Sequence, residues 1–151
     1  MNNAVVLDPD VVAGCIASPQ RHHTDIVALL DLCASERAAL LGTTWWMAYL
    51  GELMVSVRLA FAQKDLRFTR RLITDRLPVH TLFFLERLQE ETTVRKADLR
   101  AADVAGHDAL SAGQMALARQ EDALYVSRDP VPEGVRACTP ERLAAILQES
   151  G

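Results

Sequence analysis

Short apolar runs alternate with longer amphipathic segments along this chain. Continuous apolar runs are typical of strands buried on both faces, whereas apolar residues three or four positions apart indicate helices. The runs expected to form strands are residues 4–7, 38–41, 92–95, 123–126 and 135–138. Because helical segments separate these strands, the pattern predicts a mainly parallel α/β sheet with helices on both faces.

Turn and capping residues set the expected helix ends. Ser18-Pro19 should end a first helix that begins near Asp10, and Thr24 can cap the second. Proline suits the first turn of a helix, where its missing N–H costs nothing. The further helices are expected at residues 45–62, 66–74, 78–90 and 108–120, and from Pro140 onward.

Length and composition predict one domain spanning residues 1–151. The chain is half apolar, which suffices for a sizeable core. No apolar run approaches the roughly 20 residues of a membrane span, and MNNAVVLD lacks the basic region and cleavage site of a signal peptide. We therefore expect a cytoplasmic protein with no membrane partner. The three cysteines lack CxxC spacing, so neither a disulfide framework nor a zinc site is indicated.

The net charge of −4 argues against a protein that coats nucleic acid. One local exception is the basic stretch of residues 58–76, which contains Arg67, Arg70 and Arg71. This stretch is either a solvated helix face or a rim that contacts phosphates.

Acidic residues follow or precede the expected strands at several points. Asp8 comes directly after the first strand, Asp129 follows strand 123–126, and Asp108 begins the helix before that strand. Ligands of open parallel sheets bind beyond the carboxyl ends of the strands, so these acids are expected at one edge. Such oxygen-rich clusters suit Mg²⁺ or Mn²⁺. Each acid alone is equally explained as a loop or helix-capping residue.

Three segments resemble the PIN-domain family of metal-dependent ribonucleases, which includes the VapC-type toxins of bacteria. They are VVLDPDVV, HDALSAGQMALARQEDALYVSRD and GVRACTPERLAAIL. The resemblance implies a three-layer α/β/α fold with a central, mainly parallel sheet. It also implies that Asp8, Asp108 and Asp129 bind Mg²⁺ or Mn²⁺, with Asp10 at the second polar position of the first motif.

The segment GTTWWMAYLGEL departs from the family pattern. Matched without gaps, it puts Tyr49 where the family has a glutamate of the active site. Glu52 lies three residues later on the same helix face, displaced by about 4.5 Å, and is the candidate substitute.

Two functions follow from the resemblance. The first is a metal-dependent ribonuclease, as the toxin of a toxin-antitoxin pair, with RNA as substrate, an antitoxin protein as partner and a homodimer as assembly. Its catalytic acids would be Asp8, Glu52, Asp108 and Asp129. The second is a PIN-like binding or regulatory protein without catalysis, with Tyr49 as the sign of loss.

Two polar and aromatic pairs near residue 45 have alternative interpretations. Trp45 and Trp46 could stack on bases, but packing against the sheet or a second subunit is favoured. Because adjacent residues point to different sides of a helix, one tryptophan needs another surface. Thr43 and Thr44 could contact a phosphate, but capping of the helix is favoured.

Overall fold

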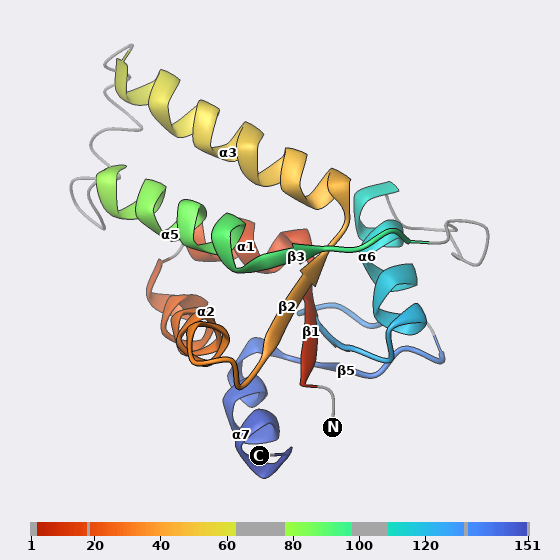
Figure 1. Ribbon diagram of the computed structural model, residues 1–151. Coiled ribbons are helices and arrows are strands. Elements are labelled where there is room, and N and C mark those ends of the chain that lie inside the picture. Colours follow the sequence, from red (N-terminus) through yellow and green to blue (C-terminus); the bar gives the residue numbers. More distant parts are fainter. Residues whose placement is uncertain (1–2, 18, 63–77, 98–108, 132, 151) are drawn as a thin grey trace.

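The computed structural model describes residues 3–17, 19–62, 78–97, 109–131 and 133–150. Within these residues a single parallel sheet has the strand order β3-β2-β1-β4-β5 (Figure 1). The strands are β1 (Ala4–Leu7), β2 (Ala39–Gly42), β3 (Thr92–Val94), β4 (Leu124–Val126) and β5 (Ala137–Cys138). The predicted parallel α/β sheet is therefore confirmed, and every expected strand is present within two residues of its expected ends.

Helices separate β1, β2, β3 and β4 along the chain, and a last helix follows β5. They are α1 (Pro9–Ala17), α2 (Pro19–Ala34), α3 (Thr44–Ala62), α5 (Pro78–Glu91), α6 (Ala109–Gln120) and α7 (Pro140–Ser150). The prediction that Thr24 caps the second helix is wrong. The helix begins at Pro19, whose fixed φ suits the first turn, and Thr24 lies exposed inside it. The helix expected at residues 66–74 lies outside the described residues.

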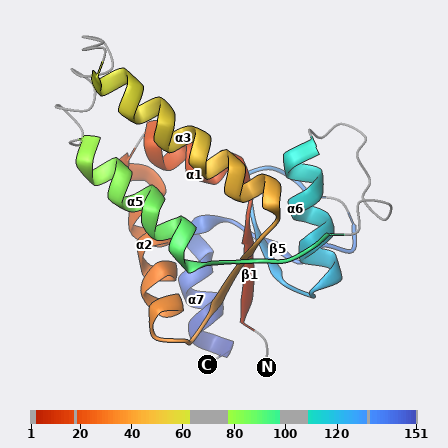
Figure 2. The same ribbon diagram turned by 45° about the horizontal axis from the view of Figure 1, so that its top comes forward.

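Alternate residues of β1 supply two separate cores. Val5 and Leu7 are buried with α1, α2, α3, α5 and α7 on one face of the sheet. Ala4 and Val6 are buried with α6 on the other face. Both figures show α6 across the sheet from α2 and α5, with the start of α3 near it (Figure 2). A strand covered on both faces must be apolar throughout, which explains the continuous run AVVL.

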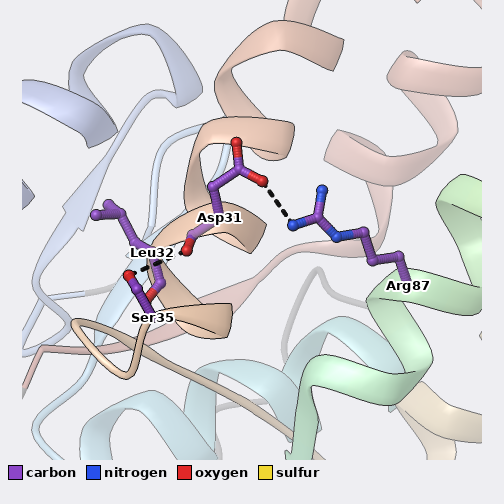
Figure 3. A network of polar contacts seen from close by, with 4 residues as sticks. All are labelled: Asp31, Leu32, Ser35 and Arg87. Atoms are coloured by element: carbon purple, nitrogen blue, oxygen red, sulfur yellow. Dashed lines mark hydrogen bonds and ion pairs between the residues drawn. The ribbon is translucent and has the colours of Figure 1, made fainter.

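A surface ion pair joins two helices of the larger layer. Arg87 on α5 approaches Asp31 on α2, with 2.6 Å between Nη2 and Oδ1 (Figure 3). The hydroxyl of Ser35 donates to the backbone carbonyls of Asp31 and Leu32, at 3.1 and 3.2 Å, near the end of α2. Asp31 is largely exposed, so this contact contributes at most about 1 kcal/mol.

Candidate functional site

Asp8 lies at the junction of β1 and α1. Its backbone N–H donates to the Val126 carbonyl at 2.9 Å, so the residue extends the pairing of β1 with β4. Its Oδ2 accepts a hydrogen bond from the backbone N–H of Asp10 at 3.2 Å, which caps the first turn of α1. Its Oδ1 accepts a hydrogen bond from the hydroxyl of Tyr125. Only 5% of Asp8 is exposed, so these donors fix its orientation at the end of the strand.

The surroundings of Asp10 disfavour a negative charge on its carboxyl group. Its Oδ1 is buried and has no hydrogen-bond donor among the described residues. Burial, and then the neighbouring carboxyls of Asp8 and Asp129, raise the pKa of Asp10 to about 8. The carboxyl of Asp10 therefore lies near the carboxyls of Asp8 and Asp129, whose charges disfavour its ionised form.

Asp129 reaches this cluster from the turn after β4. Its backbone N–H donates to the Ser127 hydroxyl at 3.1 Å, and Ser127 N–H donates to the Cys138 carbonyl of β5 at 3.0 Å. These bonds hold the turn at the carboxyl edge of the sheet. We name Asp8, Asp10 and Asp129 the acid cluster. The structure thus brings Asp8 and Asp129 to the same edge, as expected, and adds Asp10 between them.

Among the described residues, the structure records no other predicted site residue in contact with the acid cluster. Asp108, Arg67, Arg70 and Arg71 lie outside the described residues. Glu52 is exposed on α3, and the structure records no hydrogen bond or ion pair between it and the acid cluster. Its part in the site therefore stays a prediction.

Tyr49 lies beside the acid cluster. Its hydroxyl donates to the carbonyl of Pro9, between Asp8 and Asp10, at 3.3 Å. Its ring centroid lies 6.0 Å from that of the buried Trp46. Tyr49 thus places a hydroxyl against the first residue of α1, between two acids of the cluster.

Gln114 of α6 ties two strand ends together. It is fully buried, its Nε2 donates to the Leu7 carbonyl at 2.9 Å, and its Oε1 accepts from the Thr43 N–H at 3.0 Å. Leu7 directly precedes Asp8, and Thr43 follows β2. A buried amide with both ends satisfied fixes the spacing between these two strand ends.

A pocket of about 380 Å³ opens at the carboxyl ends of β2 and β3. The residues around it include Thr43, Trp45, Val94, Arg95, Lys96 and Gly113. Thr43 also caps α3, since its Oγ1 accepts from the Trp46 N–H at 3.1 Å. The favoured capping role of Thr43 is thereby confirmed.

Three residues of this site were missed from the sequence as site residues: Asp10, Tyr125 and Gln114. Asp10 was visible as the second acid of Asp8-Pro9-Asp10, with the two-residue spacing that a strand-to-helix turn can bring together. Gln114 was visible as a large polar residue in a helix of small apolar ones. Tyr125 gave no signal, because a tyrosine in an apolar strand fits a core position equally well.

The donor chemistry of the acid cluster fits a hard divalent cation. Mg²⁺ and Mn²⁺ take carboxylate oxygens, and the buried Oδ1 of Asp10 is an oxygen without a donor. Within the described ranges, no group of three or more His, Cys, Asp or Glu side chains is arranged so that it could hold a metal ion, and this includes the acid cluster taken by itself. The predicted ligand Asp108 lies outside those ranges.

The three cysteines are packing residues. Cys15 and Cys33 are buried and Cys138 is half-buried, and none of the three forms a disulfide bond. Burial is the main reason why the pKa values of Cys33 and Cys138 rise to about 11. Neither thiol is activated as a nucleophile.

Comparisons with known proteins returned no match, whether against family models, curated proteins or solved structures. Across the described residues, no helix has the length and apolar character that crossing a membrane requires.

Proposed function

We propose that this protein is a Mg²⁺- or Mn²⁺-dependent endoribonuclease. The observation that supports this best is the acid cluster, in which Asp8, Asp10 and Asp129 meet at the carboxyl edge of a parallel sheet. Like charges close together at a partly buried site are unfavourable, and a buried oxygen with no donor adds to that cost. A bound cation would remove both penalties at once, which is why the arrangement suits a metal site.

Each residue of the acid cluster would contribute a carboxylate ligand to the cation. Asp8 is held by Tyr125 and by the Asp10 N–H, so it presents a fixed carboxylate. Asp10 and the exposed Asp129 would complete the ligand set from α1 and from the turn after β4. A divalent ion held by these carboxylates would lower the pKa of a water that it binds and would neutralise charge that builds on a phosphate during in-line displacement.

Further residues enter the proposal from the sequence alone. Asp108 is the proposed additional ligand, and Glu52 the proposed additional catalytic acid. Arg67, Arg70 and Arg71 are the proposed contacts to RNA phosphates.

Calorimetric titration with Mn²⁺ tests the metal site directly. We expect the wild-type chain to bind the ion and Asp8→Asn, which keeps the shape of the side chain, to lose binding. Affinity should rise from pH 6 to pH 8.5, because Asp10 must lose its proton to coordinate. Glu90→Gln is the matched control, since Glu90 is an exposed acid on α5. Equal binding by wild type and Asp8→Asn, or no binding by wild type, would sink the proposal.

Cleavage is then measured on a labelled single-stranded RNA with Mn²⁺ present. Wild type should cut internal bonds, and Asp8→Asn should reduce the rate by more than about 10-fold, because the loss of even an outer-shell partner of a metal typically costs about 10- to 100-fold. EDTA should abolish cleavage by the wild type.

One observation favours a second candidate, a PIN-like binding or regulatory protein without catalysis. Tyr49 fills the position of the family glutamate and its hydroxyl contacts Pro9. Under this alternative the wild type binds Mn²⁺ but does not cut RNA, and Tyr49→Glu gains cleavage. Tyr49→Phe is the control, since it removes the hydroxyl without adding an acid. Cleavage by the wild type would exclude this alternative.

The toxin interpretation adds two partners, an antitoxin protein and a second copy of the chain. A short open reading frame next to the gene, whose product co-purifies with this chain and inhibits cleavage, would support the first. Light scattering after size exclusion would detect the homodimer. A monomer at all concentrations would contradict it.

A further inference from the structure

The two neighbouring tryptophans have opposite environments. Trp46 is fully buried, and its indole N–H donates to the Thr92 hydroxyl at 3.3 Å. Trp45 is 49% exposed and lines the pocket at the carboxyl ends of β2 and β3. Trp46 therefore serves the core, as favoured from the sequence. Trp45 instead presents a large aromatic surface to an open pocket.

Two cationic residues line the same pocket. Arg95 and Lys96 follow β3 directly, and both are exposed. Two hydrogen bonds hold the backbone of these residues in place. The Arg95 N–H donates to the Gly42 carbonyl at 2.9 Å. The Lys96 carbonyl accepts from Gln120 Nε2, also at 2.9 Å. The ion pairs recorded among the described residues involve other arginines. The Arg95 guanidinium donates from Nη1 to the Val94 carbonyl at 3.3 Å, and both cationic side chains remain exposed at the pocket.

The pocket adjoins the acid cluster. Val6 of β1 pairs with Leu41 of β2, and continuing this register by two residues places Asp8 beside Thr43. Adjacent strands lie about 4.8 Å apart. Gln114 bonds to the Leu7 carbonyl and the Thr43 N–H, which fixes this relation. A nucleic-acid strand bound along this edge would meet the aromatic and cationic pocket next to the carboxylates.

We propose that this pocket binds one nucleotide of single-stranded RNA, with its base stacked on Trp45 and a flanking phosphate held by Arg95 and Lys96. The observations combine an aromatic surface with solvent-facing positive charge, which is the chemistry of single-strand binding. A base within a duplex is already stacked and paired, so the pocket selects single strands. This assignment rests on the proposed function for the statement that the bound strand is the one cleaved.

Fluorescence anisotropy with a labelled single-stranded oligoribonucleotide, in EDTA, tests the stacking contact. Loss of one stacked base weakens binding by about 5- to 150-fold, so Trp45→Ala should lose affinity within this range. Trp45→Phe should keep most of the affinity, because it retains an aromatic face. Phe83→Ala is the matched control, since Phe83 is an exposed aromatic residue on α5. Circular dichroism verifies that each variant is folded.

Intrinsic fluorescence gives an independent readout. The chain has two tryptophans, and RNA should quench only the exposed Trp45. Wild type should therefore lose emission on adding RNA, while Trp45→Phe, which retains buried Trp46, should not. Quenching that persists in Trp45→Phe would overturn the stacking assignment.

Salt dependence tests the phosphate contacts. Each phosphate contact to a single strand contributes about 0.7 to the slope of log affinity against log salt. The double variant Arg95→Gln/Lys96→Gln should reduce this slope by about 0.7 to 1.4. Arg136→Gln is the control, because Arg136 precedes β5 at the opposite edge of the sheet. An equal loss with the control, or equally tight binding of duplex RNA, would overturn the proposal.

The two proposals can fail separately. Cleavage by wild type with an unchanged KM in Trp45→Ala would exclude the nucleotide pocket and leave the nuclease intact. Trp45-dependent binding of single-stranded RNA without cleavage would support the pocket and count against the nuclease.

Discussion

The hydroxyl of Tyr125 donates a hydrogen bond to the carboxylate of Asp8, although the two residues are far apart in sequence. Tyr125 pairs with Val6 across β4 and β1, and Asp8 lies two residues beyond Val6 on the same face of the sheet. The fully buried phenol ring therefore extends toward the end of β1 and orients the acid. The core of the sheet thus fixes the first carboxylate of the acid cluster.

Tyr125→Phe should lower the free energy of unfolding by about 1–3 kcal/mol, measured by urea denaturation in EDTA. The substitution removes a buried donor and leaves an oxygen of Asp8 unsatisfied. Tyr49→Phe should cost no more than about 1 kcal/mol, because its hydroxyl makes a longer bond to a carbonyl and is half-buried. Equal effects of the two variants would contradict the role given to Tyr125.

Asp10 should make the metal-free protein less stable as the pH rises from about 4 to about 8. The unfolded chain loses the Asp10 proton near pH 3.8, whereas the folded chain keeps it until about pH 8. Between these values the unfolded state binds fewer protons, so stability falls as pH rises and then levels off.

Thermal melts in EDTA at pH 5 and pH 8 measure this effect. Asp10→Asn should reduce the drop in Tm between the two pH values, and Glu90→Gln should leave it unchanged. A drop of the same size in Asp10→Asn and wild type would refute the assignment. Saturating Mn²⁺ should also reduce the drop, because the cation favours ionised carboxylates.

Gln114→Leu should lower the free energy of unfolding by about 2 kcal/mol or more. It removes the partners of two buried backbone groups, the Leu7 carbonyl and the Thr43 N–H. Gln120→Leu, in the same helix, is the control and should cost less than about 1 kcal/mol, since the exposed Gln120 bonds at the surface. Similar losses in both variants would mean that Gln114 acts only through helix packing.

Gly42→Ala and Gly51→Ala should change stability in opposite directions. A Cβ at Gly42 would overlap Cδ1 of Trp46 and lie 2.9 Å from its Cγ and 3.0 Å from Thr92 Cγ2. The fully buried indole cannot move away, so a loss of about 1–3 kcal/mol is expected. A Cβ at Gly51 meets no atom within 4 Å inside α3, so Gly51→Ala should gain about 0.5–1 kcal/mol. Thermal melts of both variants check the two signs.

The sheet could be predicted because its strands have simple local causes. The run AVVL is apolar at every position, since β1 has neighbours on both faces, and the residues before and after it are polar. The predicted start of α2 was wrong because Thr24 directly precedes an apolar pattern of helical spacing. A threonine in that position indicates a helix cap even where the helix begins earlier. Pro19 decided the start instead.

The candidate site was predictable only in part. Asp8 and Asp129 followed from the rule that parallel strands place their carboxyl ends at one edge. The spacing of a motif could not show that Asp10 faces both acids, because this depends on how α1 leaves β1. Asp108 and the basic residues 67, 70 and 71 stay predictions from the sequence.

By itself, the sequence determined the order of the described strands and the place of Asp8 and Asp129 at the sheet edge, because burial pattern and chain direction are local properties. Only the tertiary structure decided the surroundings of those acids. Tyr125 reaches Asp8 from β4, Gln114 joins the ends of β1 and β2 from α6, and Trp45 turns to the pocket while Trp46 fills the core. Each of these relations joins elements that the chain separates, so it depends on how they pack.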